Sequence, residues 1–437
     1  MATIGAQSFA SVPPSLTRRF AWAVAFSLFA GSVVNYIDRA VLGVVMPEVR
    51  SDLSLSNAGY GFAVNAFLLT YMASYVLGGR LADRLGCRRT FSLALVLWSF
   101  ASVAHAFAQG LRSLCIVRAM LGAGEGIFYP AAIKGATEWF APKDRAKAIG
   151  LFLSGLSVGT LLTPPIVAWI VVHYGWRSAF VATGGIGFLI LPPWLLIHRR
   201  VRKNFGMPDP APAHVASAFV ETNSDEGTTL GEGFKRRKYL LMLVARALTD
   251  VTWYFYLFWI PGYFQEVRGF DAQMVGQYLW APYFGGGIGA LTGAWASSAL
   301  MHRGWGLDSA RKSVLFTSAS LCLAGPSAFL VSRPMAIGLV AVGLFGCLSW
   351  SSNLHTAITE ISPKRHAATL YGITGAAGAL AGAISQPLIG RVVDIRGYTP
   401  VLLGVALLHI LAAGAVFGAG RIEPYRCSSV ISAVSAP

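Results

Sequence analysis

The chain has 437 residues, of which 55% are hydrophobic and only 12% are charged. That composition is too apolar for a soluble domain of this length and indicates an integral membrane protein. The formal net charge of +16 does not indicate nucleic-acid binding, because the Lys and Arg residues are spread over short connecting segments rather than gathered on one soluble module.

Twelve apolar runs are each long enough to cross about 30 Å of hydrocarbon as a helix. In chain order they cover residues 20–46, 57–81, 91–109, 111–138, 146–172, 177–198, 239–264, 273–301, 313–331, 335–360, 367–393 and 399–419. Lys and Arg residues concentrate in alternate connecting segments, which the positive-inside rule makes cytoplasmic, together with both termini. We therefore predict an all-α membrane protein with twelve transmembrane helices, whose first run stays as an uncleaved anchor.

The runs divide into two halves that resemble each other. We predict a cytoplasmic tail over 1–19, a six-helix bundle over 20–198, a cytoplasmic linker over 199–238, a second bundle over 239–419 and a cytoplasmic tail over 420–437. The segment TEWFAPKDRAKAIG at 137–150 parallels TEISPKRHAATLYG at 359–372. Duplicated halves that enclose a site near the bilayer midplane are typical of transporters that work by alternating access.

Two runs of the first half carry opposite charges into the membrane, at roughly 2.5–3.5 kcal/mol each on insertion scales. Asp38 and Arg39 lie in the first run, and Arg118 and Glu125 lie in the fourth. Arg118 and Glu125 are about 10.5 Å apart along one helix, so we expect each to find a partner of opposite charge on the first helix. A static ion pair of Asp38 with Arg39 is the structural alternative.

These four formal charges sum to zero. Protonation of one carboxylate would leave a cationic surplus that attracts an anion, and loss of the proton would restore the internal pairing. Proton and anion would then bind cooperatively by linkage. Arg118 is a candidate substrate contact under this hypothesis, with a gate or scaffold role as the alternative.

Several segments together resemble a known family. Gly79 to Arg89, GRLADRLGCRR, is similar to the signature loop of the major facilitator superfamily, with Cys87 where a basic residue is common. NYIDR in the first run, RAMLGAGEGIFYPA in the fourth and YFYLFWIPGYFQEVRGF in the seventh resemble the anion:cation symporter family, and within it the bacterial hexuronate and galactonate proton symporters. The resemblance covers nearly the whole chain outside the linker and tails.

The resemblance implies roles for particular residues. Asp38 and Glu125 match the family's proton-binding acids, and Arg39 matches the arginine that holds the substrate carboxylate. Tyr36 and Tyr71 match hydroxyls that line the sugar-acid site. The signature loop implies a conformational latch, for which we name Gly79, Asp83, Arg84 and Arg88.

The second half offers fewer candidates. Arg246 and Asp250 are four residues apart and can pair along one helix, with Arg246 as a possible second anion contact. The stretch WSSNLH, residues 350–355, is the most polar of the second half, so we name Trp350 and Asn353 as cavity candidates. His105, near the outer end of the third run, is interpreted as a surface histidine.

Two departures from the sugar-acid pattern widen the range of substrates. Leu156 stands where a galactonate-type transporter carries a glutamine, and the region near Gly375 lacks the corresponding asparagine. The leading hypothesis is proton-coupled uptake of a small organic anion, most simply a hexuronate or aldonate, across a bacterial inner membrane. Tartrate-like or aromatic carboxylates, and proton-coupled efflux of an amphipathic compound, remain open.

The remaining expectations concern enzyme activity, cofactors, metal sites, disulfides and partners. No nucleophile and base, nucleotide loop or CxxC pair occurs in the sequence, so we expect no enzyme activity, no cofactor, no metal site and no disulfide framework. The driving force would be the proton gradient. Expected partners are the organic anion, protons and the lipid bilayer, without nucleic acid, and we expect the protein to be a monomer.

Overall fold

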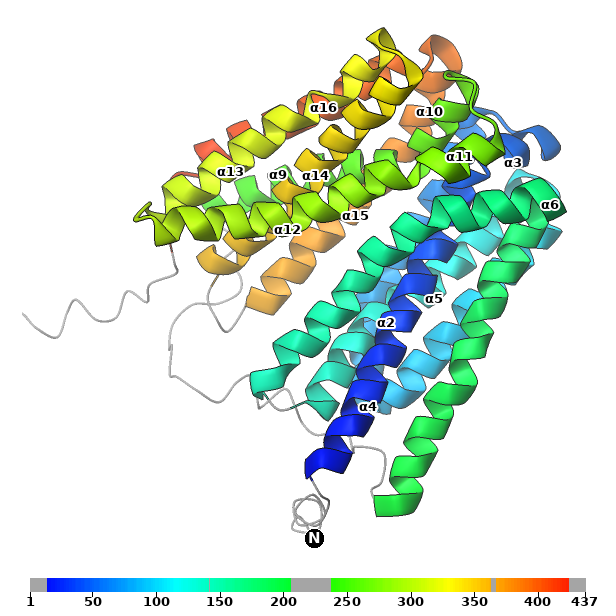
Figure 1. Cartoon of the computed structure of the whole chain (residues 1–437), viewed down its shortest axis with the longest axis vertical. Helices are drawn as coiled ribbons and strands as arrows, with labels where there is room; N and C mark the ends of the chain where they lie inside the picture. The colour runs from blue at the N-terminus through cyan, green and yellow to red at the C-terminus, as the bar shows by residue number, and fades with distance from the viewer. Residues whose placement is uncertain (1–13, 141, 206–236, 363–366, 424–437) are drawn as a thin grey trace, which may run out of the picture. The chain divides into compact units, whose positions relative to one another are not determined.

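The structure is a computed structural model that describes residues 14–140, 142–205, 237–362 and 367–423. All regular elements within these residues are helices, most of them long (Figure 1). The first half contains α2 (Pro14–Val44), α3 (Met46–Asp52), α4 (Asn57–Ala104), η1 (His105–Phe107), α5 (Leu111–Trp139) and α6 (Pro142–Phe205). The second contains α9 (Arg237–Phe258), α10 (Ile260–Glu266), α11 (Ala272–Tyr278), α12 (Trp280–His302), α13 (Leu307–Cys322), η2 (Gly325–Leu330), α14 (Arg333–Ile361), α15 (Ala367–Arg396) and α16 (Thr399–Gly418).

The twelve predicted crossings correspond to these helices. Eight helical stretches are apolar and long enough to span a membrane, and two of them, Asn57–Phe107 and Lys147–Val201, have 51 and 55 residues, enough for two crossings each. With α5 and the α11–α12 segment the number is twelve, which confirms the predicted fold class. The seventh and eighth crossings are each interrupted between two helices. Pro261 is the second residue of α10 and Pro282 is the third residue of α12, so a proline lies just after each break.

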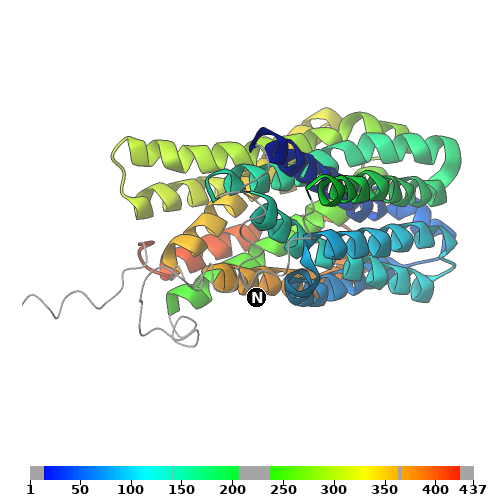
Figure 2. The ribbon, with the colours of Figure 1, turned by 90° about the horizontal axis from the view of Figure 1, so that it is seen from below.

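Glycine supplies the reversals inside the two double-length helices. Gly86 in α4 and Gly175 in α6 have φ of 75° and 78°, a backbone conformation that other residues adopt only with strain. The ribbon of α6 turns back on itself at this point in both views (Figures 1 and 2). Each reversal sends the next crossing back through the membrane without a longer loop.

The first compact unit comprises residues 1–213, 255–284 and 383–398. Within it, α4 and α5 approach closely at Gly126, which has no side chain. A Cβ at this position would lie 2.5 Å from the backbone oxygen of Tyr71. This contact brings the neighbouring Glu125 beside α4. We call the end of this unit that contains α3, η1 and α10 the α3 end.

Backbone and carboxylate contacts join segments of both sequence halves at the α3 end. Asp394, in the last turn of α15, accepts hydrogen bonds of 2.9 Å from the backbone N–H of Asn57, the side-chain amide of Asn57 and the N–H of Ala58. The Arg50 guanidinium forms an ion pair of 2.5 Å with Glu266. Asp394 thus caps the first turn of α4, where free N–H groups favour a negative charge.

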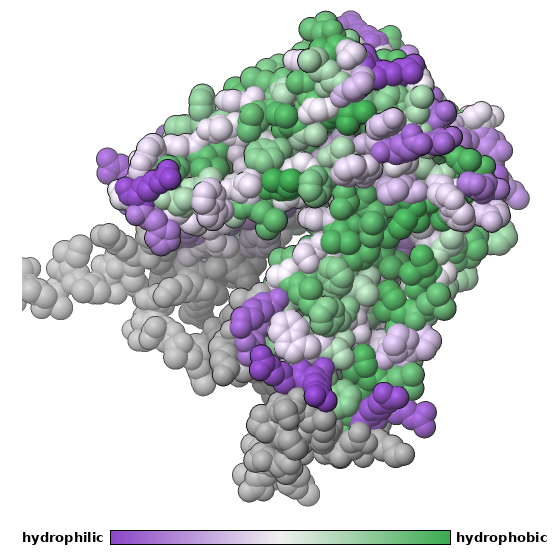
Figure 3. All heavy atoms as spheres, viewed as in Figure 1, coloured by the Kyte–Doolittle hydropathy of each residue, from purple (hydrophilic) through white to green (hydrophobic). Residues whose placement is uncertain are grey.

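The second compact unit comprises residues 214–254, 285–382 and 399–437. Its core contains Tyr239, Leu315, Trp350, Leu370 and Ala412, which come from α9, α13, α14, α15 and α16. Large apolar side chains outside the cores are exposed, among them Leu291, Trp295, Leu189 and Ile395, each at least 69% exposed. In Figure 3 hydrophobic side chains cover much of the visible helix surface and hydrophilic ones gather near helix ends, as expected for contact with lipid.

The two predicted boundaries of the linker, at 199 and 238, lie near the end of α6 and the start of α9. α6 continues to Phe205, six residues beyond the predicted start of the linker at 199, and α9 begins at Arg237. Most of the predicted linker and of both predicted tails lies outside the described residues. The predicted boundaries therefore stay predictions.

Candidate functional site

A buried ion pair between α2 and α5 forms the centre of the candidate site. The Nε and Nη2 of Arg39 lie 2.9 Å and 2.8 Å from Oε2 of Glu125, and Arg39 Nη2 also donates to Asn35 Oδ1 at 3.3 Å. Arg39 is 4% exposed and Glu125 is 1% exposed. The pairing across two helices agrees with the charge pattern of the sequence, since neither charge is buried without a partner.

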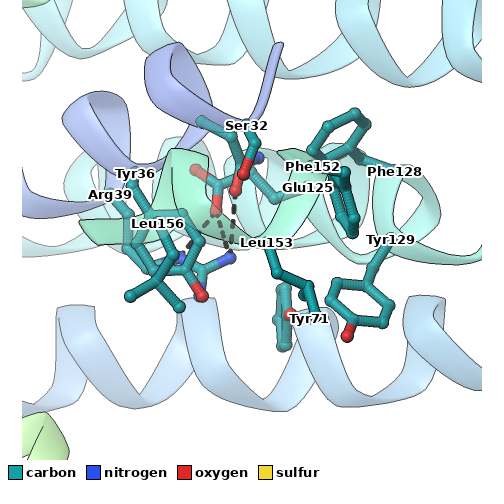
Figure 4. Close-up of a pocket in the computed structure, with 11 residues that line it drawn as sticks. Ser32, Tyr36, Arg39, Tyr71, Glu125, Phe128, Tyr129, Phe152, Leu153 and Leu156 are labelled. Atoms are coloured by element: carbon teal, nitrogen blue, oxygen red, sulfur yellow. Dashed lines mark hydrogen bonds and ion pairs between the residues drawn. The ribbon is translucent and has the colours of Figure 1, made fainter. Parts of the chain in front are cut away.

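Aromatic rings frame the guanidinium of Arg39. Its Cζ lies 4.6 Å from the ring centroid of Tyr36 and 4.5 Å from that of Tyr71, distances suited to cation–π attraction. The small hollow beside these groups, which we call the Arg39 hollow, is shown in Figure 4. It is lined by Ser32, Asn35, Tyr36, Arg39, Tyr71, Glu125, Phe128, Tyr129, Phe152, Leu153 and Leu156.

The Arg39 hollow combines an anion-binding group with a titratable one. The Oε1 of Glu125 has no hydrogen-bond partner within the described residues, so this oxygen can accept a proton without breaking a bond of the site. Protonation would remove the charge that balances Arg39. A carboxylate ligand could then take that role, because guanidinium binds carboxylate in a two-point geometry.

Asp38 faces away from the Arg39 hollow although it is adjacent to Arg39 in sequence. Its Oδ1 accepts a hydrogen bond of 2.7 Å from the hydroxyl of Ser102 on α4. Successive residues on an α-helix point about 100° apart, so Asp38 and Arg39 meet different neighbours. The alternative of a static Asp38–Arg39 ion pair has no support in this geometry.

Arg118 does not find the oppositely charged partner that we expected. Its side chain is fully buried, and none of its three guanidinium nitrogens has a hydrogen-bond partner in residues covered by the structure. The Cζ lies 6.0 Å and 5.9 Å from the rings of Phe67 and Phe180. Arg118 also does not line the Arg39 hollow, so its proposed contact with substrate stays a prediction.

His105 corrects another sequence-based interpretation. It is completely buried at the α3 end instead of lying on the surface, and its ring stacks on Phe180 at a centroid distance of 4.6 Å. The position near the end of a crossing suggested exposure. The returning part of α6, which carries Phe180, covers this position, and a hydropathy profile carries no such information.

The predicted latch loop contacts α5 at the end of the first unit opposite α3. Asp83 accepts a hydrogen bond of 3.1 Å from Lys134, while Arg84 is exposed. Lys134 is only 7% exposed, and the Glu138 carboxylate accepts from the N–H of Cys87 at 3.3 Å.

The other two predicted latch positions have less specific surroundings. Gly79 has open space where a Cβ would be, and the carbonyl of Arg88 accepts a hydrogen bond of 3.2 Å from the indole of Trp194. These contacts fix the loop against α5 and α6. A latch role for Gly79, Asp83, Arg84 and Arg88 stays a prediction.

The second unit contains a separate polar cluster at Arg246. Its Nε donates to Asp250 at 2.8 Å, which is the pairing along the helix that the sequence predicts. Another guanidinium nitrogen of Arg246 contacts Nε2 of His355, and His355 Nδ1 lies 3.3 Å from the hydroxyl of Tyr371. His355 and Tyr371 were not among the candidate site residues. The polar stretch that contains His355 was the only signal for it.

Two predicted site residues in the polar stretch of α14 are buried in the second unit. Trp350 is fully buried in the core against His409, and Asn353 is 1% exposed and accepts from Arg311 at 3.4 Å. Ser351, Ser352 and His355 occupy the half-exposed face instead. The 3.6-residue period separates these two sets, so Trp350 and Asn353 are unfavourably placed for substrate contact in this structure.

Comparison with known proteins shows the family. Curated relatives include a hexuronate transporter of Escherichia coli strain K12, 26% identical over 90% of this chain and 92% of the relative. A hexuronate transporter of Bacillus subtilis strain 168 is 29% identical over 85% and 87%, and a D-galactonate transporter of Escherichia coli O6:H1 is 27% identical over 88% and 92%.

Solved structures share the fold at low sequence identity. A D-xylose-proton symporter superposes with a TM-score of 0.70 at 17% identity, covering 93% of this chain and 98% of the symporter. A bacterial homologue of the human lysosomal transporter Spinster, in an inward-facing unoccupied conformation, gives 0.69 at 19% identity, over 92% and 95%. Residues 28–386 match the family model described as Major Facilitator Superfamily, and the chain therefore belongs to that superfamily of membrane transporters.

Proposed function

We propose that this transporter carries a small organic anion, most simply a sugar acid, inward across a bacterial inner membrane by proton symport and alternating access. The observation that supports the proposal best is the Arg39–Glu125 pair, buried under aromatic rings inside the first unit. A carboxylate substrate replaces Glu125 as the counter-ion of Arg39 when Glu125 takes a proton. The curated relatives named for hexuronate and galactonate support the substrate class.

The energetics of anion uptake favour coupling to protons. Each elementary charge moved through 100 mV is worth about 2.3 kcal/mol, so an anion alone enters a negative cytoplasm against this amount. One proton per monoanion cancels the penalty. Lys and Arg residues concentrate in the segments opposite the α3 end, so we infer that the α3 end faces the outside and both termini face the cytoplasm.

The second candidate substrate class is a less hydroxylated or aromatic carboxylate. The wall of the Arg39 hollow contains Phe128, Phe152, Leu153 and Leu156, which offer apolar contact and no hydrogen bonds. Tyrosine hydroxyls from Tyr36, Tyr71 and Tyr129 supply the polar side-chain groups beside Ser32 and Asn35. Such a wall stacks on a planar ring at least as well as on a sugar ring.

Proteoliposome transport tests the proposed function. Purified protein is reconstituted and presented with labelled glucuronate, galactonate, tartrate and benzoate, with and without an inward proton gradient. We expect gradient-driven accumulation of at least one sugar acid by the wild type. Accumulation of benzoate alone would support the second substrate class, and indifference of every acid to the gradient would overturn proton symport.

The Glu125→Gln variant tests the assigned proton acceptor. The amide keeps the shape and one acceptor oxygen of the carboxyl group but does not titrate. We expect loss of gradient-driven accumulation with retention of counterflow exchange, since Arg39 still binds the substrate. Glu48→Gln, the same change at a partly buried α3 residue outside the Arg39 hollow, should keep both activities. Normal accumulation by Glu125→Gln would remove Glu125 from the coupling mechanism.

A further inference from the structure

Polar atoms without protein partners gather inside the first unit near its α3 end. They include Oδ2 of Asp38, Nε2 of His105 and all three guanidinium nitrogens of Arg118, none of which has a hydrogen-bond partner in the described part of the chain. All three residues are at most 1% exposed. Buried polar atoms of this kind are normally satisfied by ordered water, so we expect water molecules to bind beside them.

The hydrogen-bond geometry fixes the tautomer of His105. Its Nδ1 lies 2.7 Å from the carbonyl oxygen of Ala101, one turn earlier in α4. A carbonyl oxygen only accepts, so Nδ1 carries the hydrogen. Neutral His105 therefore presents Nε2 as an unprotonated acceptor inside the protein, where it can bind a proton.

Ser102 is a shared neighbour of His105 and Asp38. Ser102 precedes His105 by three residues, which places both side chains on one face of the helix. The Ser102 hydroxyl donates to Oδ1 of Asp38 at 2.7 Å. The Oδ2 of Asp38 and the Nε2 of His105 have no hydrogen-bond partner in the described residues, so each can bind a bridging water.

His105 is close in sequence to the surface of the unit. Phe107, two residues later in η1, is 75% exposed. The partly exposed Arg177 holds the turn by donating to the carbonyl of Ala106 at 3.0 Å and pairs with Asp52. His105 therefore lies two residues from an exposed side chain at the α3 end.

We propose that His105 relays protons between the external face and Asp38, an inference that rests on the proposed proton symport. Nε2 takes a proton that enters from the external side and passes it through a bridging water to the Asp38 carboxylate, which restores the neutral imidazole. Arg118 on α5 is the nearby cation, because its Cζ lies 5.9 Å from the Phe180 ring on which His105 stacks. Asp38 on α2 is the nearby acid, bonded to Ser102, and Phe180 on α6 adds no charge.

The His105→Gln variant tests the relay against a matched control. His198 is also buried, at 4% exposure, and its Nδ1 also contacts the carbonyl four residues earlier, at 2.9 Å, but it lies in the last part of α6. We expect His105→Gln to lower the initial rate of gradient-driven uptake by about tenfold or more while counterflow exchange stays normal. His198→Gln should leave both rates unchanged.

Two further measurements separate proton transfer from folding. In His105→Ala, externally added imidazole should restore gradient-driven uptake, and the rescue should depend on pH. A ring with a purely structural role would give no pH-dependent rescue. The rescue should increase with the concentration of neutral imidazole. Wild-type rates in His105→Gln, or a His105→Ala variant that loses counterflow and gradient-driven uptake together without rescue, would overturn the relay. Absence of gradient-driven uptake in the wild type would overturn the proposed symport and the relay with it.

Discussion

The carboxylate cap at the α3 end should control how readily this end opens. Asp394 of α15 receives three hydrogen bonds of 2.9 Å from Asn57 and Ala58 at the start of α4. Asp394→Asn keeps one acceptor oxygen but turns an NH₂ group toward a backbone N–H, so one hydrogen bond is lost and the negative charge disappears. The perturbation therefore weakens this particular contact without altering the Arg39 hollow.

The expected size of the effect follows from exposure. A hydrogen bond to a charged group contributes about 1.5–3 kcal/mol, and a charge at a helix N-terminus contributes about 0.3–1 kcal/mol. The Asp394 side chain is exposed, so solvent screening reduces the total to roughly 1 kcal/mol. At 25 °C this is about a fivefold increase in the population whose α3 end is open.

Thiol labelling measures that population. Ala383 of α15 is fully buried, and its carbonyl accepts from Asn65 of α4 at 2.7 Å. A cysteine introduced at 383, in a background without the native cysteines, should react about fivefold faster with an impermeant external reagent when Asp394→Asn is added. High salt should shrink the difference. Asp144→Asn, which removes only an ion pair with Lys147 within α6, is the control, and a labelling rate unchanged by Asp394→Asn would refute the role of the cap.

Three further changes test other parts of the structure. Arg39→Lys should weaken carboxylate binding by about tenfold or more in equilibrium binding assays, since an ammonium cannot replace the planar fork between Tyr36 and Tyr71; unaltered affinity would take Arg39 out of the site. Leu156→Gln should improve competition by polyhydroxylated acids over benzoate in uptake assays, and no change would show that this wall does not contact substrate. Gly390→Ala should speed labelling at 383 more than Asp394→Asn does, because its Cβ would lie 2.2 Å from the backbone oxygen of Asn57; slower labelling would contradict the close approach.

Much of the fold could be predicted because hydrocarbon imposes simple requirements on a sequence. Apolar runs of sufficient length identify the crossings, and a charge inside such a run needs a partner, which is why the Arg39–Glu125 pair could be anticipated. The reversals at Gly86 and Gly175 follow from a backbone conformation that few residues but glycine adopt.

The direction of each side chain could not be predicted in the same way. Hydropathy does not distinguish the faces of a helix that is largely apolar, so Trp350 was named as a cavity candidate although it is buried, whereas His355 of the same polar stretch lies on the half-exposed face. The burial of His105 depends on a ring of another helix. The Asp394 cap had a signal in the sequence, because GRVVDIRG at 390–397 repeats the pattern of the GRLADRLG loop at 79–86.

Membership of the first unit does not follow the order of the sequence, and this has a consequence for dividing the gene. Residues 255–284 and 383–398 pack with the first half, and Gly43 and Gly61 of that half leave no room for a Cβ against Leu257 and Gln386. A cut inside the linker would therefore yield an amino-terminal fragment in which the helix faces at Gly43 and Gly61 lack the segments that pack on them. Such a fragment should accumulate in cells only when the carboxy-terminal fragment is produced beside it.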